Sequence, residues 1–145
     1  MVEDVALIVR NFIIEKFQRS STICGISACL INYALNKLKV KNLICTNTQH
    51  AFVISGDSIV DVTVDQFEKT YGEICIIDKS HCKKKYFWKS LIKFDGYEEF
   101  ALWQEKSGWP SNQILFNYEN MLEEFDEYFN KNFKNKRTKK TRKSN

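Results

Sequence analysis

Near the middle of the chain, residues 50–64 read His50-Ala51-Phe52-Val53-Ile54-Ser55-Gly56-Asp57-Ser58-Ile59-Val60-Asp61-Val62-Thr63-Val64. β-Branched and aromatic residues alternate with smaller or polar ones on both sides of Gly56-Asp57, a dipeptide typical of a tight turn. The pattern predicts a β-hairpin made of strands 50–55 and 58–64.

The register of this hairpin brings an acid close to the only histidine in it. With a two-residue turn, Thr63 lies opposite His50, and Asp61 lies one diagonal step away on the same face, within reach of a long side chain. Asp65 shares that face but lies further along the strand direction. Asp61 is therefore the first candidate to orient the His50 ring, and Asp65 is the second.

Two helices are predicted ahead of the hairpin. Apolar residues recur at helical spacing over about residues 3–18 and again over about 24–39, and Arg19-Ser20-Ser21-Thr22 breaks the pattern and offers hydroxyl groups as N-caps. Cys24 then falls on the first turn of the second helix. The unpaired N–H groups and the positive end of the helix dipole favour a thiolate there and can also bind a developing oxyanion.

The rest of the chain completes an α+β pattern with an antiparallel sheet. Short strands are predicted at Leu43–Thr46 and Gly72–Asp78, and the aromatic-rich segment Tyr86–Phe94 is expected either to continue the sheet or to cover it. The remaining predictions are a helix over Tyr97–Lys106, a turn over Ser107–Pro110 and a last amphipathic helix spanning Tyr118 to Phe129.

Length and composition favour one globular domain. The chain has 145 residues, of which 43% are hydrophobic and 28% charged, which is ordinary for a folded protein with its own core. No apolar run reaches the roughly 18 to 20 residues that span a bilayer, and Met1-Val2-Glu3-Asp4 is acidic where a secretory signal is basic. We therefore expect an intracellular, cytoplasmic protein without a membrane partner.

The cysteines predict neither a disulfide framework nor a metal centre. Their number, five, is odd, and none of them forms a CxxC pair. The dipeptide His81-Cys82 beside Cys75 is the one alternative to reduced thiols, but it lacks the second spaced pair of a tetrahedral site. We expect no metal and no cofactor.

Charge divides the chain into an acidic body and a basic end. Lys131–Asn145 carries eight Lys and Arg residues and no acid, which leaves 14 basic against 18 acidic residues, or about −4, in residues 1–130. A stretch this basic is usually disordered, and the pattern predicts a contact with nucleic acid or with an acidic partner. The alternative is a solubilising tail that pairs loosely with the acidic stretch Glu119–Glu127.

The residue types of a cysteine-dependent site are all present: Cys24 can be the thiol nucleophile, His50 its base and Asp61 the group that orients the base. Each also has a structural alternative, because cysteine is commonly a small core residue and a polar residue in a strand commonly faces solvent. Their order along the chain favours a site for cysteine-dependent acyl transfer.

The run from Cys24 through His50-Ala51-Phe52-Val53 to Ile59-Val60-Asp61-Val62-Thr63-Val64-Asp65-Gln66-Phe67 resembles the transglutaminase-like branch of the papain-like superfamily, and within it small bacterial and phage members. The resemblance covers about residues 18–67. It implies a helix carrying the cysteine, packed on an antiparallel sheet that carries the histidine and the aspartate. It also implies the triad Cys24, His50 and Asp61.

What the resemblance implies for function is a cysteine protease, amidase, deamidase or acyltransferase that acts on a peptide or a glutamine-type amide. Gln18 precedes Cys24 by six positions, as the oxyanion-hole glutamine does in papain-like proteases. Phe52 stands where many relatives carry tryptophan, and the segment between Cys24 and His50 is short, so a reduced substrate groove is expected. The alternative is a catalytically silent module of the same fold that binds a protein or nucleic acid through its groove or its basic end.

Overall fold

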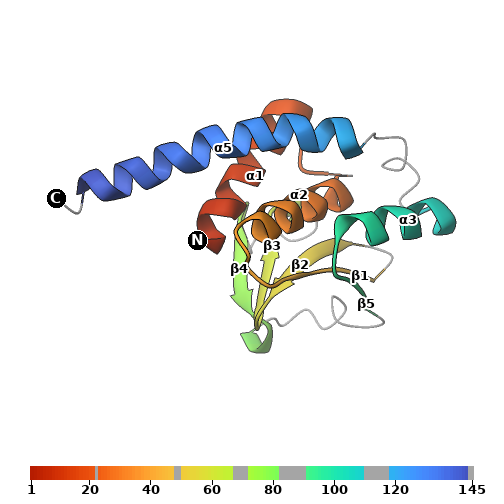
Figure 1. The fold of residues 1–145 in the computed structure, drawn as a ribbon. Coiled ribbons are helices and arrows are strands. Elements are labelled where there is room, and N and C mark those ends of the chain that lie inside the picture. Colours follow the sequence, from red (N-terminus) through yellow and green to blue (C-terminus); the bar gives the residue numbers. More distant parts are fainter. Residues whose placement is uncertain (22, 48–49, 67–71, 82–90, 110–117, 144–145) are drawn as a thin grey trace.

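A computed structural model describes residues 1–21, 23–47, 50–66, 72–81, 91–109 and 118–143, and it confirms the α+β class (Figure 1). The elements are α1 (Val2–Phe17), α2 (Cys24–Lys37), β1 (Leu43–Thr46), β2 (Ala51–Ser55), β3 (Ser58–Asp61), the 3-10 turn η1 (Val64–Gln66), β4 (Cys75–Asp78), the 3-10 turn η3 (Lys79–His81), β5 (Ile92–Phe94), α3 (Tyr97–Ser107) and α5 (Tyr118–Lys143).

The strands form one antiparallel sheet in the order β4-β3-β2-β1-β5. Ser55 pairs with Ser58 and Val53 pairs with Val60, so the predicted two-residue turn and its register are confirmed. Gly56 has a φ of 60°, the left-handed conformation that such a turn requires and that glycine adopts without strain.

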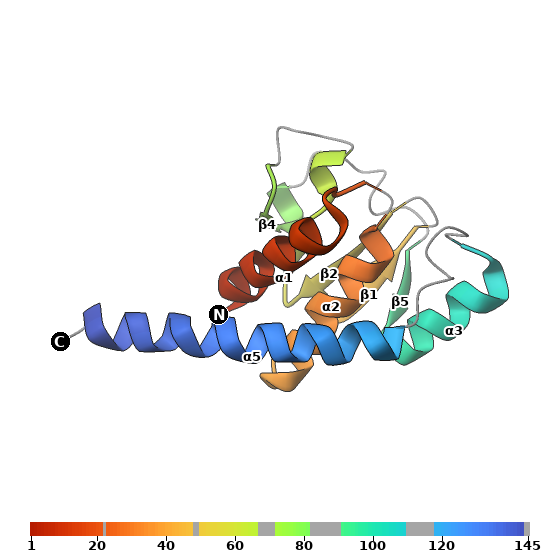
Figure 2. The ribbon, with the colours of Figure 1, turned by 90° about the horizontal axis from the view of Figure 1, so that it is seen from above.

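Helices α1, α2 and α5 lie on the same face of the sheet (Figures 1 and 2). α2 packs against β1 and β2 and is flanked by α1 and α5. The predicted spans of α1 and α2 agree with the observed ones to within two residues. Apolar side chains at helical spacing on both helices form the main core. This spacing places them on one face of each helix, and packing that face against the rest of the fold removes it from water.

Strand β3 ends earlier than predicted. The sequence predicted a strand to Val64, with Thr63 opposite His50, but the ladder between β2 and β3 stops at Val53 and Val60 and the strand ends at Asp61. The Asp61 carboxylate accepts a hydrogen bond from the backbone N–H of Thr63 at 2.8 Å, which turns the chain. Such a local bond competes with the sheet ladder, and the chain enters η1 instead.

The outer strands are shorter than predicted. β4 covers only the second half of Gly72–Asp78, and β5 covers the end of Tyr86–Phe94, where it continues the sheet beside β1. Residues 86–90 of that aromatic segment lie outside the described residues, as does Pro110 in the predicted turn 107–110.

The last helix is longer than predicted. The composition of residues 131–145 predicted a disordered tail, whereas α5 continues as a helix through Lys143 and extends beyond the body of the molecule (Figures 1 and 2). Lys and Arg are good helix formers, no Gly or Pro interrupts the segment, and cations are favourable near a helix C-terminus. Among the described residues, no helix is both long enough and apolar enough to cross a bilayer.

The first half of α5 is anchored by an aromatic cluster, which gives the first testable prediction. Phe125 is fully buried, and its ring lies 5.2 Å from that of Phe12 and 6.3 Å from that of Tyr33, both edge to face. We expect Phe125→Ala to lower the free energy of unfolding by about 3 to 5 kcal/mol, because it removes this packing and leaves a cavity. Urea denaturation followed by circular dichroism measures the change.

The matched control is Leu102→Ala on α3, where the side chain is 52% exposed. Substitutions at such surface positions change stability by about 0.5 kcal/mol or less. An equal loss of stability in the two variants would show that Phe125 does not anchor α5.

Candidate active site

His50 is held in the short connection between β1 and β2. Its backbone N–H donates to the side-chain oxygen of Asn47 at 3.0 Å, and its carbonyl accepts from the Thr46 hydroxyl at 2.9 Å and from the Asn47 N–H at 3.3 Å. Sequence reasoning placed His50 in the strand and missed both neighbours. The signal was available, because asparagine is a frequent turn residue that bonds its own backbone.

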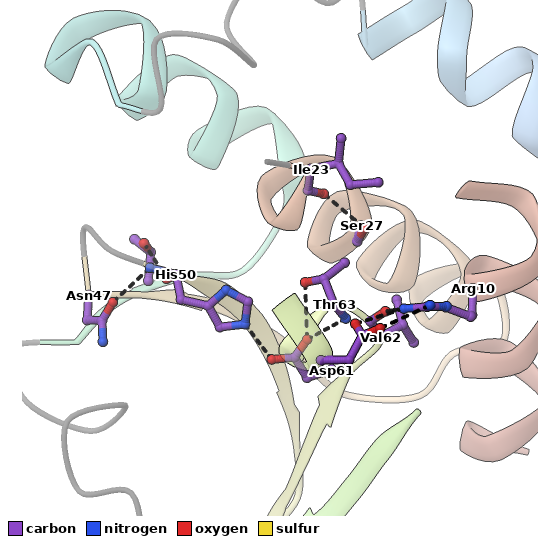
Figure 3. Close-up of polar contacts among 10 residues, drawn as sticks. Arg10, Ile23, Ser27, Asn47, His50, Asp61, Val62 and Thr63 are labelled. Atoms are coloured by element: carbon purple, nitrogen blue, oxygen red, sulfur yellow. Dashed lines mark hydrogen bonds and ion pairs between the residues drawn. The ribbon is translucent and has the colours of Figure 1, made fainter. Parts of the chain in front are cut away.

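The predicted contact between His50 and Asp61 is present. His50 Nε2 lies 2.5 Å from Asp61 Oδ2, and the two residues are 1% and 4% exposed (Figure 3). The other carboxylate oxygen, Oδ1, accepts hydrogen bonds from the Thr63 N–H at 2.8 Å and from the Thr63 hydroxyl at 3.3 Å. Both oxygens of Asp61 are thus used, and the carboxylate is fixed in orientation.

Cys24 is the first residue of α2 and is 5% exposed. The N-cap is Ile23 and makes no side-chain cap bond; Thr22, which sequence analysis offered as a hydroxyl cap, lies outside the described residues. No acidic residue lies in the first turn of α2, so the positive end of its dipole is not neutralised by a carboxylate of its own.

The surroundings of His50 favour its protonated form. Burial of the ring is the largest influence and opposes protonation, but the charge of Asp61, its hydrogen bond, and then a hydrogen bond and a charge interaction with Cys24 raise the pKa of His50 from 6.5 to about 10. The ring is therefore paired with an acid from β3, and the thiol of Cys24 at the start of α2 makes a smaller contribution to its pKa.

The second candidate acid, Asp65, has a different partner. Its two carboxylate oxygens accept hydrogen bonds from the guanidinium of Arg10 in α1, at 2.9 and 3.1 Å. Arg10 is itself 8% exposed and was missed by sequence reasoning, which assigned α1 to packing alone. A single arginine on the apolar face of a helix is a signal for a buried ion pair, because such a charge needs a partner.

Gln18 is not part of the buried network. It is the C-cap of α1, in the left-handed conformation with φ 57°, and its N–H donates to the Ile14 carbonyl at 2.8 Å. Its side chain is exposed.

The three residues considered as alternative metal ligands differ in their surroundings. Cys75 is buried in β4, His81 is exposed in η3, and Cys82 lies outside the described residues.

Comparison of this chain with protein-family models, with curated proteins and with solved structures finds no match.

The raised pKa of His50 predicts how stability depends on pH. The pKa of His50 in the folded state, about 10, exceeds its unfolded value near 6.5. Protonated His50 therefore makes its full contribution to the free energy of unfolding below about pH 6.5, and this contribution is lost as the pH rises towards 10. We expect NMR of the ring nitrogens to show a charged His50 at pH 8, and Asp61→Asn to lower its pKa and flatten the decline in unfolding free energy over this range.

His81→Gln serves to assign the two histidine signals, because the chain contains only His50 and His81. If His50 titrated near 6.5 in the wild type, or identically in Asp61→Asn, the electrostatic account of the pair would be wrong.

Proposed function

We propose that this chain is a cysteine-dependent hydrolase or acyltransferase with Cys24 as nucleophile, His50 as base and Asp61 as the group that orients His50. The observation that carries the proposal is the buried pair of His50 Nε2 and Asp61 Oδ2 at 2.5 Å, next to a helix that begins at Cys24 and packs on the strand after His50. The thiol of Cys24 also contributes to the raised pKa of the His50 ring. A helix carrying a cysteine, packed on the strand that follows the histidine, also supports a papain-like, transglutaminase-like core.

The proposed reaction begins with a thiolate and an imidazolium, because proton transfer from Cys24 leaves the charge on the His50 ring that Asp61 stabilises. The thiolate attacks the carbonyl carbon of an amide, forming a carbon–sulfur bond and a tetrahedral oxyanion. His50 then gives its proton to the leaving nitrogen, the carbon–nitrogen bond breaks, and a thioester on Cys24 remains. Water or an amine, deprotonated by His50, attacks this thioester and releases the free thiol.

The Cys24 backbone N–H is the proposed donor to the oxyanion. It lies at the start of α2, where such groups have no partner within the helix, and an oxyanion donor is typically worth roughly 3 to 4 kcal/mol. The exposed position of Gln18 gives no support to the same role for its side chain.

The proposed substrate is a peptide or a glutamine-type side-chain amide. The exposed fraction of Cys24, 5%, favours a slender group such as a side-chain carboxamide over a broad folded surface. Hydrolysis of the thioester corresponds to a protease, amidase or deamidase, and attack by an amine corresponds to an acyltransferase. The alternative, a silent binding module of the same fold, differs in having no activated thiol.

This difference predicts the alkylation behaviour of Cys24. We expect iodoacetamide to label Cys24 rapidly well below pH 8, because the imidazolium stabilises its thiolate, and we expect His50→Ala to slow this labelling at least about tenfold. Peptide mass spectrometry after timed quenching gives the rate for each cysteine. A second readout is a mass increase on Cys24, absent in Cys24→Ser, after incubation with an activated acyl ester.

Cys45 serves as the internal control. Burial raises the pKa of its thiol to about 11, and it should label slowly in both proteins. If Cys24 labels no faster than Cys45, or at the same rate whichever residue occupies position 50, the enzyme proposal fails and the silent module is favoured.

The basic end of α5 supports a second, independent proposal, that it contacts the phosphate backbone of a nucleic acid. The helix extends beyond the body of the molecule, and residues 134–143 contain seven Lys or Arg, two Thr and one Asn but no apolar residue. Without apolar anchors, a membrane surface or a protein groove is a poorer match than phosphate groups, which basic and hydroxyl-bearing residues bind without regard to sequence.

We expect a fluorescent 20-base-pair DNA duplex to bind the full chain at 50 mM salt, with an affinity that falls steeply as salt rises because counterions are released. Fluorescence anisotropy measures the binding. A chain ending after Lys134 should lose this binding, because it lacks six of the eight basic residues in Lys131–Asn145.

Cys24→Ser is the matched control and should bind DNA like the wild type. Binding that persists at high salt or in the shortened chain would contradict this proposal, and equal competition by polyglutamate would favour an acidic protein partner instead.

A further inference from the structure

A buried arginine on α1 reaches the segment that follows the candidate acid. Arg10 Nη1 donates to the Val62 carbonyl at 2.8 Å and to Asp65 Oδ1 at 2.9 Å, and Nη2 donates to Asp65 Oδ2 at 3.1 Å (Figure 3). The side chains of Arg10 and Asp65 are 9% and 20% exposed. One guanidinium therefore holds two points of the chain, Val62 just after β3 and Asp65 within η1, from a helix more than fifty residues earlier.

These two points bracket the turn that Asp61 makes. Val62 directly follows Asp61, and Thr63, which donates two hydrogen bonds to Asp61 Oδ1, lies between Val62 and Asp65. The antiparallel pairing of Asp61 with Cys75 fixes the strand side of this turn. On the other side, where the ladder has ended, Arg10 is the cation that binds the segment to the rest of the fold.

We propose that Arg10 is a positioning residue for the Asp61–His50 pair, acting by holding Val62 and Asp65 so that Asp61 Oδ2 stays against His50 Nε2. The inference rests on the proposed function for its catalytic meaning, but the positioning itself concerns only the Asp61–His50 contact. The bidentate geometry matters, because the planar fork of arginine fixes direction as well as distance, which the single ammonium of lysine does not.

Loss of Arg10 leaves a carbonyl and a carboxylate close together without their shared cation. Such groups move apart or towards water, since a buried charge without a partner is costly. Any shift of residues 62–65 is transmitted to Asp61 through the two Thr63 hydrogen bonds. The groups that act on the charge of His50 are Asp61 from β3 and Cys24 from α2, so a displaced Asp61 removes the larger stabilising partner.

The test compares Arg10→Met and Arg10→Lys with Lys16→Met. Lys16 lies on the same helix and forms an ion pair at 2.5 Å with Glu124 of α5, so its replacement breaks an ion pair on α1 without touching residues 61–65. The readouts are the pKa of His50 by ring-nitrogen NMR and the pH profile of Cys24 alkylation, with thermal unfolding to confirm the fold.

We expect Arg10→Met to lower the pKa of His50 by about one unit or more, roughly a tenfold change in proton affinity, and to slow alkylation of Cys24 at neutral pH. Arg10→Lys should fall between Arg10→Met and the wild type, and Lys16→Met should match the wild type. An unchanged His50 pKa in folded Arg10→Met would overturn the proposal.

Two further variants keep the test decisive. If Arg10→Met does not fold, Asp65→Asn takes its place, because it removes the charge of the carboxylate and keeps the shape of the side chain. A His50 pKa equal to that of the wild type in both Asp65→Asn and Arg10→Lys then overturns the proposal. The same titration in a Cys24→Ser background needs no enzyme activity. A His50 pKa that depends on Arg10 there supports positioning even if Cys24 never forms an acyl-enzyme, so the two proposals fail separately.

Discussion

Helix α2 is buried on nearly all sides, and the other elements are arranged around it. Eleven of its fourteen residues are buried, because the sheet lies beneath it and α1 and α5 pack on either side. A helix enclosed in this way has little freedom to slide or rotate, since protein interiors are close-packed. Its first turn is therefore fixed relative to β1 and β2, on which the helix packs. The position of Cys24 is thus set by core packing before any polar contact contributes.

The parts of the site that the sequence predicted are those that short-range rules determine. The Gly56-Asp57 turn sets the register of the hairpin, and the register sets which acid comes within reach of His50, so the contact with Asp61 followed from counting residues. The position of Cys24 at the start of a helix followed from apolar periodicity and from the polar break before it. Both rules depend on neighbours within a few residues, which the sequence shows directly.

The parts that were missed depend on partners distant in the chain or on side chains that replace backbone bonds. Arg10 and Asp65 lie 55 residues apart, and no local pattern links them. Thr63 leaves the strand because Asp61 takes its N–H, a competition between side chain and sheet that alternation of residues does not reveal. β5 pairs with β1 at the far edge of the sheet, and α5 continues into a segment whose charge predicted disorder. In each case tertiary context or helix continuity outweighed composition.

The short separation between His50 and Asp61 has a consequence for folding order. His50 and Asp61 lie eleven residues apart across one tight hairpin, a local structure of the kind that closes within microseconds. Cys24 comes from a helix that must first be enclosed by elements from both ends of the chain, including α5. Contacts between distant segments form more slowly than local ones. Cys24 therefore reaches its native position only when the core is complete, after the hairpin that carries His50 and Asp61 can already have closed.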